Sequence, residues 1–283
     1  MDGICDCHMH VFGPPNRYPG GPNRSYTPTE RGLDDYEPVA AEVGIERIVI
    51  VQPSAYGTDN RCTLDAVRRR GEATRAVVVV DPDVTDDELG VMHALGVRGI
   101  RLNAVTRGGT DPEGVDARLR MLARRIEGLG WHVQLYADPD LVARLAPVVR
   151  EAPVPVVFDH MGGARSTQTP DDVRFRALCD LLGEGRCWVK LSGADRVTAQ
   201  DQGFTGAGPF ARALIAANPE QVVWGSDWPH LGDHGGGTGD AAPPAQYRSV
   251  PESGLLAALE GWAGDATTLR RILVDNPARL YGF

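Results

Sequence analysis

Residues 4–11 read Ile4-Cys5-Asp6-Cys7-His8-Met9-His10-Val11, and they form the first of eight short runs that we predict as β-strands. The other seven runs cover residues 47–52, 76–80, 98–102, 132–136, 154–159, 187–191 and 221–226. Amphipathic stretches that favour helices separate them, at residues 85–95, 115–129, 139–150, 171–182 and 209–218. Because strands that alternate with helices pair in parallel, eight such units predict the α/β class and a closed (β/α)8 barrel of the TIM type.

An open doubly wound sheet is the alternative to a barrel. Such a sheet would carry a glycine-rich dinucleotide fingerprint after its first strand, and none follows residue 11. The sequence shows no repeat, linker or second domain, so we expect residues 1–283 to form one domain. Two irregular segments, residues 12–29 and 231–246, each follow a strand, and we interpret them as lids over the barrel mouth or as plain surface loops.

Charge and composition exclude several classes of partner. The net charge of −9 argues against a nucleic-acid partner and against binding to an anionic membrane. No apolar run reaches the roughly 18 residues of a membrane span, and the first residues lack the basic region and apolar core of a signal peptide. The five cysteines form an odd, scattered set, which favours reduced thiols and a cytoplasmic protein. The sequence leaves the oligomeric state open.

The first strand carries two candidate catalytic residues. Strict alternation divides it into two faces, one with Ile4, Asp6, His8 and His10 and the other with Cys5, Cys7 and Met9. We expect both histidines to point into the barrel mouth, and the cysteines to pack outward against helices as small hydrophobes. A His-x-His pair is weak evidence alone, because such residues are often core residues, but its place at the end of a barrel strand favours a function.

Asp227 and His160 follow two other predicted strands. The strand before Asp227 is the eighth, which lies beside the first in a closed barrel, so the carboxylate should stand next to His8 and His10. A carboxylate beside imidazoles binds a metal ion, or holds a water molecule and takes its proton. His160 ends the sixth strand. The alternatives are an aspartate that caps the next segment and a histidine buried in the core.

Cationic and aromatic residues at the strand exits predict an anionic ligand. Arg101 ends the fourth strand, and a guanidinium buried in a barrel mouth is costly unless it meets an anion. Further candidates are Arg107 just beyond it, Tyr136 at the end of the fifth strand, Arg196 after the seventh, and Tyr26 in the first irregular segment. For Arg196 and Tyr26 a solvated loop position is the alternative. We interpret His93, His132 and His234 as structural or surface residues. His230 belongs to a motif described below.

Motifs spread over nearly the whole chain match one known family. They are Asp6-Cys7-His8-Met9-His10-Val11-Phe12-Gly13-Pro14, Val51-Gln52-Pro53-Ser54, Gly57-Thr58-Asp59-Asn60, Arg98-Gly99-Ile100-Arg101-Leu102-Asn103, Asp159-His160-Met161-Gly162, Lys190-Leu191-Ser192-Gly193, Trp224-Gly225-Ser226-Asp227-Trp228-Pro229-His230 and Asp275-Asn276-Pro277-Ala278-Arg279-Leu280-Tyr281-Gly282-Phe283. In these motifs the chain resembles the branch of the amidohydrolase superfamily that contains 2-pyrone-4,6-dicarboxylate lactonase and sugar lactonases. The resemblance implies the amidohydrolase type of barrel and the hydrolysis of a cyclic ester.

The resemblance also implies residue roles. Asp227 would be the general base that takes a proton from the attacking water, and His8, His10 and His160 would polarise the lactone carbonyl. The positions that match carboxylate-binding residues of the family are Tyr26, Arg101, Arg107, Tyr136 and Arg196. The nearest family members suggest catalysis without a cofactor. A single Zn or Mn ion on His8, His10 and Asp227 is the alternative.

Gly163 departs from the family pattern, which has an arginine directly after Asp-His-x-Gly. Glycine removes a positive charge and should open space there, so we expect a bulkier or less acidic lactone than 2-pyrone-4,6-dicarboxylate.

The sequence therefore predicts a hydrolase that opens a small anionic lactone in aromatic or sugar-acid catabolism or a related biosynthetic pathway. One rival is a metal-dependent non-oxidative decarboxylase or amidase of the same superfamily. The other is a catalytically silent barrel that acts as a binding protein, which has no need of three histidines and an aspartate at its mouth. We predict no binuclear metal centre, because such sites use a carboxylated lysine late in the fourth or fifth strand. The only lysine of this chain, Lys190, lies on the seventh.

Overall fold

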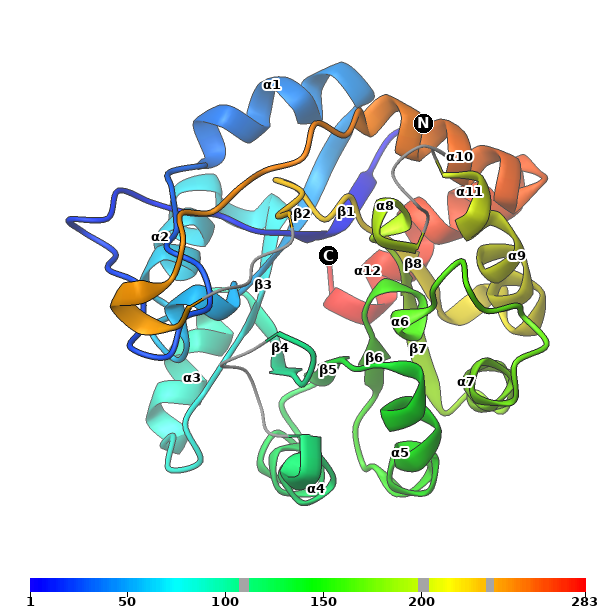
Figure 1. Cartoon of the computed structure of the whole chain (residues 1–283), viewed down its shortest axis with the longest axis horizontal. Helices are drawn as coiled ribbons and strands as arrows, with labels where there is room; N and C mark the ends of the chain where they lie inside the picture. Colours follow the sequence, from blue (N-terminus) through cyan, green and yellow to red (C-terminus); the bar gives the residue numbers. More distant parts are fainter. Residues whose placement is uncertain (107–111, 198–203, 233–236) are drawn as a thin grey trace.

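The computed structural model describes residues 1–106, 112–197, 204–232 and 237–283, and its centre is a barrel of parallel strands (Figure 1). Eight strands follow one another around it in chain order: β1 (Ile4–Met9), β2 (Ile45–Val51), β3 (Thr74–Val78), β4 (Val97–Asn103), β5 (His132–Tyr136), β6 (Val156–Phe158), β7 (Cys187–Leu191) and β8 (Val222–Trp224). Each predicted run overlaps one of these strands, so the predicted (β/α)8 barrel is confirmed.

Helices surround the strands in Figure 1. Those of the α type are α1 (Leu33–Val43), α2 (Arg61–Arg70), α3 (Asp86–Ala94), α4 (Val115–Arg125), α5 (Pro139–Glu151), α6 (His160–Gly163), α7 (Val173–Gly183), α8 (Ala194–Val197), α9 (Gly208–Ala217), α10 (Glu252–Ala263), α11 (Ala266–Arg270) and α12 (Asn276–Tyr281). α3 begins with a capping box, in which Thr85 Oγ1 accepts a hydrogen bond from Glu88 N at 3.2 Å. α12 lies near the middle of the view in Figure 1. Its Tyr281 ring contacts the ring of His132, which begins β5, so it lies at the amino end of the barrel.

The barrel closes between β1 and β8, and this closure places the candidate catalytic residues side by side. Asp227 N donates to His8 O, and His10 N donates to Trp228 O, both at 2.8 Å. A Cβ atom on Gly225 would lie 2.5 Å from His8 Cβ, so only glycine allows the two chains to approach this closely. The first and eighth strands are therefore neighbours, as predicted.

The inner face of β1 departs from strict alternation. Cys5 and Cys7 lie inside the barrel, in an apolar layer with Val49, Val77 and Tyr281. The prediction that these cysteines pack outward against helices was wrong. No disulfide joins them or any other cysteine, each of which is a free thiol.

A β-bulge is the reason. Between Asp6 and Met9, three residue steps of β1 face two steps of β2. The extra residue lets His8 and His10 turn inward although Cys7 does so too. Asp6 Oδ1 accepts a hydrogen bond from His8 N at 3.0 Å within the bulge. The Asp6 side chain faces outward, where the Tyr36 hydroxyl of α1 donates to it at 2.9 Å, so it does not share a face with the histidines as predicted.

The two irregular segments after β1 and β8 are paired with each other. Thr27 N donates to Pro243 O at 2.7 Å, Ala245 N donates to Thr27 O at 2.8 Å, and Gly239 N donates to Arg24 O at 2.8 Å. The described parts of the two segments thus lie side by side, as the blue and orange chain in Figure 1 shows. Within the described parts of the chain, no helix is long and apolar enough to cross a membrane.

Candidate active site at the carboxyl end of the barrel

The turns after β6 and β8 aim His160 and Asp227 toward the barrel axis. Their backbone φ angles are 50° and 68°, in the left-handed region that residues other than glycine seldom adopt. Such a conformation costs on the order of 1–3 kcal/mol and persists where the surrounding structure enforces it, often at functional sites. The four residues His8, His10, His160 and Asp227 are all buried.

Three imidazole nitrogens converge on one carboxylate oxygen. Asp227 Oδ1 lies 3.7 Å from His8 Nε2, 3.6 Å from His10 Nε2 and 3.8 Å from His160 Nε2. These distances are too long for direct hydrogen bonds. They leave room for one small group that all four atoms can contact.

The partners behind two of the rings determine what those rings offer. His10 Nδ1 lies 2.7 Å from Val51 O, and a carbonyl oxygen only accepts, so this nitrogen carries the proton. His8 Nδ1 lies 3.2 Å from Asp159 Oδ1, which likewise only accepts while it is ionised. In their neutral forms both rings therefore present an Nε2 lone pair. They cannot donate from Nε2 to a carbonyl, which argues against that part of their predicted role.

His160 differs from the other two histidines. Its Nδ1 lies 2.9 Å from Ser192 Oγ, and a hydroxyl either donates or accepts. When Ser192 donates, neutral His160 carries its proton on Nε2 and faces the centre as a donor. The Tyr136 ring packs edge-on against His160 at a centroid distance of 4.8 Å and limits its rotation.

Burial and one arginine set the charges of the centre. Burial lowers the pKa of His8 well below its usual range and lowers the pKa of His160 to about 4, so both are neutral near pH 7. Burial alone would raise the pKa of Asp227. Its Arg196 neighbour, with Nε 2.6 Å from Asp227 Oδ2, and the histidines outweigh burial and hold that pKa well below the usual value. The centre thus combines two neutral rings, those of His8 and His160, with an ionised carboxylate.

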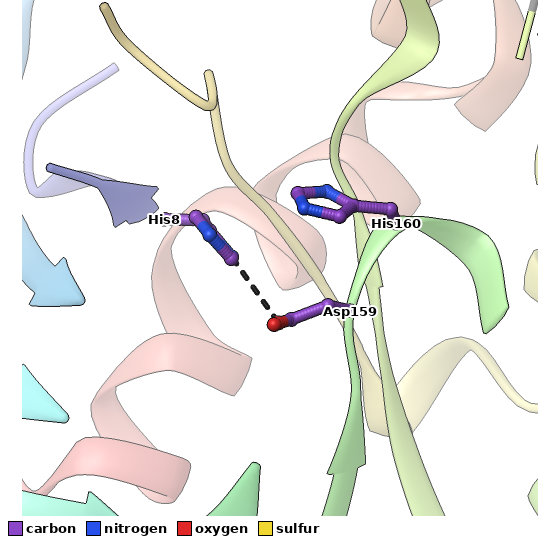
Figure 2. Close-up of side chains that lie close together, drawn as sticks. All are labelled: His8, Asp159 and His160. Atoms are coloured by element: carbon purple, nitrogen blue, oxygen red, sulfur yellow. Dashed lines mark ion pairs between the residues drawn. The ribbon is translucent and has the colours of Figure 1, made fainter. Parts of the chain in front are cut away.

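Asp159 is a central residue that the sequence reasoning missed. Figure 2 shows it below His8, with the ion pair between them drawn as a dashed line. Gln134 Nε2 donates to Asp159 Oδ2 at 3.0 Å, Arg101 Nε lies 3.5 Å from the same oxygen, and Lys190 Nζ lies 3.8 Å from Oδ1. Burial opposes its charge, but His8 and Lys190 hold the pKa of Asp159 well below its usual range. The carboxylate is therefore ionised, and from 3.2 Å it favours the neutral form of His8 that carries its proton on Nδ1.

Two of the predicted anion-binding arginines, Arg101 and Arg196, already have partners within the chain. Arg196 pairs with Asp227, and Arg101 pairs with Asp159 and donates from Nη1 to Gln52 O at 3.1 Å. The sequence argument that a buried Arg101 must await a substrate anion therefore loses its force, because Asp159 supplies that anion. Either guanidinium can still bind a substrate anion as well, since each has further N–H groups.

The remaining predicted ligand-binding residues lie in different surroundings. Tyr136 packs against His160, one of the three histidines that converge on Asp227. Tyr26 is buried; burial raises the pKa of its phenol, against a hydrogen bond with Ser54 that lowers it. Arg107 lies outside the described residues, as does His234.

An open cleft of about 580 Å³ adjoins the cluster beyond β2 and β4. Its volume suits a small-molecule ligand. Arg101 and Asn103 form part of its wall, together with Ser54 and Tyr56 from the segment after β2. Arg118 of α4 also lines it, and the sequence reasoning did not single out this residue.

Three of the converging residues could also bind a metal ion. His8, His10 and Asp227 can each offer one ligand atom, and these atoms lie within 4.8 Å of one another. Two neutral imidazoles and a carboxylate are donors that Zn and Mn accept. The acceptors at Val51 O and Asp159 would orient the two rings from behind, as in known metal sites. The residues therefore fit a single divalent ion.

Gly163 offers no space for a side chain. Its φ is 75°, and a Cβ atom would lie 2.4 Å from Ala137 O. The prediction that glycine opens room at this position was wrong, because the backbone before α5 occupies it. The prediction that remains is that position 163 lacks the positive charge that an arginine supplies there in the family.

Eight parallel strands, with His8 on the first, His10 directly after it and Asp227 after the eighth, form a TIM barrel with a polar centre at its carboxyl end. The model of the Amidohydrolase family matches residues 5–283, so the chain belongs to this family. The resemblance read from the sequence is confirmed, and so is the prediction that the chain is an enzyme of the hydrolase class.

Several relatives are similar over almost their full length. The 4-sulfomuconolactone hydrolase of Hydrogenophaga intermedia is 35% identical over 99% of this chain and 89% of its own length. The 2-pyrone-4,6-dicarboxylate hydrolase of Comamonas testosteroni is 34% identical, over 99% of this chain and 90% of its own. A crystal structure of a probable 2-pyrone-4,6-dicarboxylic acid hydrolase from Acinetobacter baumannii, with citric acid bound, superposes with a TM-score of 0.83. That protein is 27% identical, and the match covers 99% of this chain and 100% of the other.

Proposed function

We propose that this protein is a lactone hydrolase that opens a small cyclic ester carrying at least one anionic group. One observation carries the proposal: the Nε2 atoms of His8, His10 and His160 surround Asp227 Oδ1 at 3.6–3.8 Å. A carboxylate beside two lone pairs and one potential donor can hold a water molecule next to a carbonyl group.

The attacking water belongs between Asp227 and the Nε2 atoms of His8 and His10. These three groups are acceptors, so a water molecule there donates its two protons to two of them and keeps a lone pair for attack. As its oxygen bonds to the lactone carbonyl carbon, Asp227 takes one proton. His160 Nε2–H donates to the carbonyl oxygen as that oxygen becomes negative. The ring C–O bond then breaks, and the leaving oxygen receives the proton from Asp227.

Arg196 couples ligand binding to the strength of the base. Its guanidinium holds the pKa of Asp227 low, which keeps the carboxylate ionised but makes it a weak base. When a substrate carboxylate shares the guanidinium, Asp227 loses part of that stabilisation and becomes more basic. Binding of an anionic lactone thus activates the general base, and this favours an anion-binding role for Arg196.

The names of the relatives support an anionic substrate. Two act on a sulfonated and a dicarboxylated lactone, and a third was crystallised with citric acid. In this chain, Arg101, Arg107, Arg196, Tyr26 and Tyr136 are the proposed ligand-binding residues. We place the reaction in the breakdown of aromatic compounds, where such lactones form.

Catalysis with a single divalent ion is the second candidate mechanism, because His8, His10 and Asp227 fit one. When bound there, Zn or Mn would supply Lewis acidity to the water and the carbonyl. His160 and Arg196 would keep the roles given above, since neither belongs to this ligand set.

The test is turnover of a panel of carboxylated and sulfonated lactones by purified enzyme. The enzyme is assayed as isolated, after dialysis against a chelator, and after adding back Zn or Mn. Ring opening by all three preparations supports the cofactor-free mechanism. Ring-opening activity that is lost after dialysis against the chelator and restored by added Zn or Mn supports the metal-dependent mechanism. Release of carbon dioxide or ammonia instead would indicate the decarboxylase or amidase, and binding without turnover would indicate a silent barrel.

A further inference from the structure

Arg118 is a cationic residue that the proposed mechanism does not use. It lies on α4, in the wall of the 580 Å³ cleft. Its Nη2 donates to Val80 O at 3.3 Å, whereas its Nε is buried from solvent without a hydrogen-bond partner. Because Arg118 lines the cleft, its guanidinium can offer N–H groups beyond the one bonded to Val80 O to an anion there.

The cleft is close enough to the catalytic cluster for one small molecule to contact both. Val51 O binds His10, Gln52 O binds Arg101, and Ser54 lines the cleft. Three residues of extended chain span at most about 11 Å, so Val51 and Ser54 lie within the reach of one small molecule. Arg101 also belongs to both regions, since it lines the cleft and pairs with Asp159 below His8.

The charges of the cleft favour an anion near Arg118. Two carboxylates, Asp59 and Asp81, share its wall with the arginines. Asp59 is neutralised by Arg61, whose Nη2 lies 2.7 Å from its Oδ2. Asp81 is exposed to water, which weakens its repulsion. Arg24, the third arginine of the wall, is paired with Asp240.

We propose that this cleft is a subsite for a second anionic group of the substrate, a carboxylate or sulfonate, and that Arg118 together with Arg101 binds it. The substrate is then a dianionic lactone whose second anion points toward α4, away from Gly163. This inference rests on the proposed function for the identity of the substrate, but the subsite itself can be tested without turnover.

The experiment measures binding of three small probes by isothermal titration calorimetry. Isophthalate is a planar dicarboxylate without an ester to cleave, 3-sulfobenzoate replaces one carboxylate by a sulfonate, and benzoate has a single anion. Arg118→Met removes the guanidinium and keeps most of the apolar stem. Arg120→Met is the matched control, because Arg120 lies on the same helix and forms an exposed ion pair with Glu151.

We expect Arg118→Met to weaken isophthalate or 3-sulfobenzoate binding about tenfold or more, as for loss of a charge-assisted hydrogen bond, and to change benzoate binding less than twofold. The better of the two dianions identifies the group that the subsite prefers. Arg120→Met should leave all three affinities unchanged. Equal effects of Arg118→Met on benzoate and the dianions, or no effect on any probe, would overturn the subsite. A wild-type enzyme that binds isophthalate through Arg118 but opens no lactone would instead contradict the proposed function.

Discussion

Replacing Asp159 by asparagine should change the proton position on His8. Asp159 Oδ2 accepts a hydrogen bond from Gln134 Nε2 at 3.0 Å and lies 3.5 Å from Arg101 Nε. Because both neighbours are donors, the oxygen of an asparagine will lie on that side. Its NH2 group then faces His8 Nδ1 at the present 3.2 Å distance and needs an acceptor. The His8 proton moves to Nε2, which points at Asp227 Oδ1 from 3.7 Å. The lone pair that holds the water is lost.

The size of the effect follows from the contact that is lost. A hydrogen bond to an ionised partner contributes about 1.5–3 kcal/mol, and each 1.4 kcal/mol is about tenfold in rate, so kcat should fall roughly 10- to 150-fold. KM should change little, because the Asp159 side chain is wholly buried.

Two measurements check this prediction. Steady-state kinetics give kcat and KM, and ¹⁵N spectra of histidine-labelled enzyme, which has only seven histidines, report the His8 tautomer. Asp138→Asn is the control, because Asp138 caps α5 by accepting from Leu141 N at 2.8 Å and asparagine caps equally well. The reasoning is refuted if Asp159→Asn keeps kcat within twofold, or if His8 still carries its proton on Nδ1 in the folded variant.

Four further predictions follow from the same centre. Asp227→Asn should lower kcat about 100- to 10,000-fold with binding of isophthalate retained, and near-normal turnover would remove Asp227 from the base role. Ser192→Ala should lower kcat about tenfold with little change in KM, because His160 loses the partner that orients it; an unchanged kcat would mean that the ring orients itself. Elemental analysis of active enzyme should find at most one equivalent of metal per chain, and two equivalents lost together with activity would contradict the expected absence of a binuclear centre. Burial lowers the pKa of His160 to about 4 and of His132 to about 3, against 6.5 for a free imidazole, so the unfolded chain binds protons first and stability falls as pH drops below about 6.5. Each ring should cost about 2 kcal/mol of unfolding free energy between pH 7 and pH 5, and urea midpoints at the two pH values that coincide would contradict this.

The barrel could be predicted from the sequence because its signal is repeated. Each unit needs only a short β-branched run and an amphipathic stretch, and eight repetitions outweigh an error in any one boundary. The neighbourhood of His8 and Asp227 followed from closure alone, since the first and last strands of a barrel must meet. Neither inference depends on the conformation of a single residue.

The errors lie where one residue leaves the regular pattern. The bulge in β1 breaks the period of two, so alternation assigned the wrong face to Cys5 and Cys7. The left-handed backbone at Asp227 and Gly163 is equally invisible in a pattern of residue types. It decides where the Asp227 carboxylate points and whether position 163 has room for a side chain.

The layer below the mouth could have been found, because alternation works in the strands that contain it. Counting back two residues from Tyr136 gives Gln134, and two residues from Ser192 gives Lys190, so both should face inward. Lys190 was used only to exclude a binuclear centre, whereas its Nζ donates to Gln134 Oε1 at 2.6 Å and to Cys7 O at 2.8 Å. A lysine is almost never wholly buried without partners, so a lysine on an inner face already implies a buried carboxylate within reach. That carboxylate is Asp159, and through it the layer below the mouth determines which nitrogen of His8 faces the reaction.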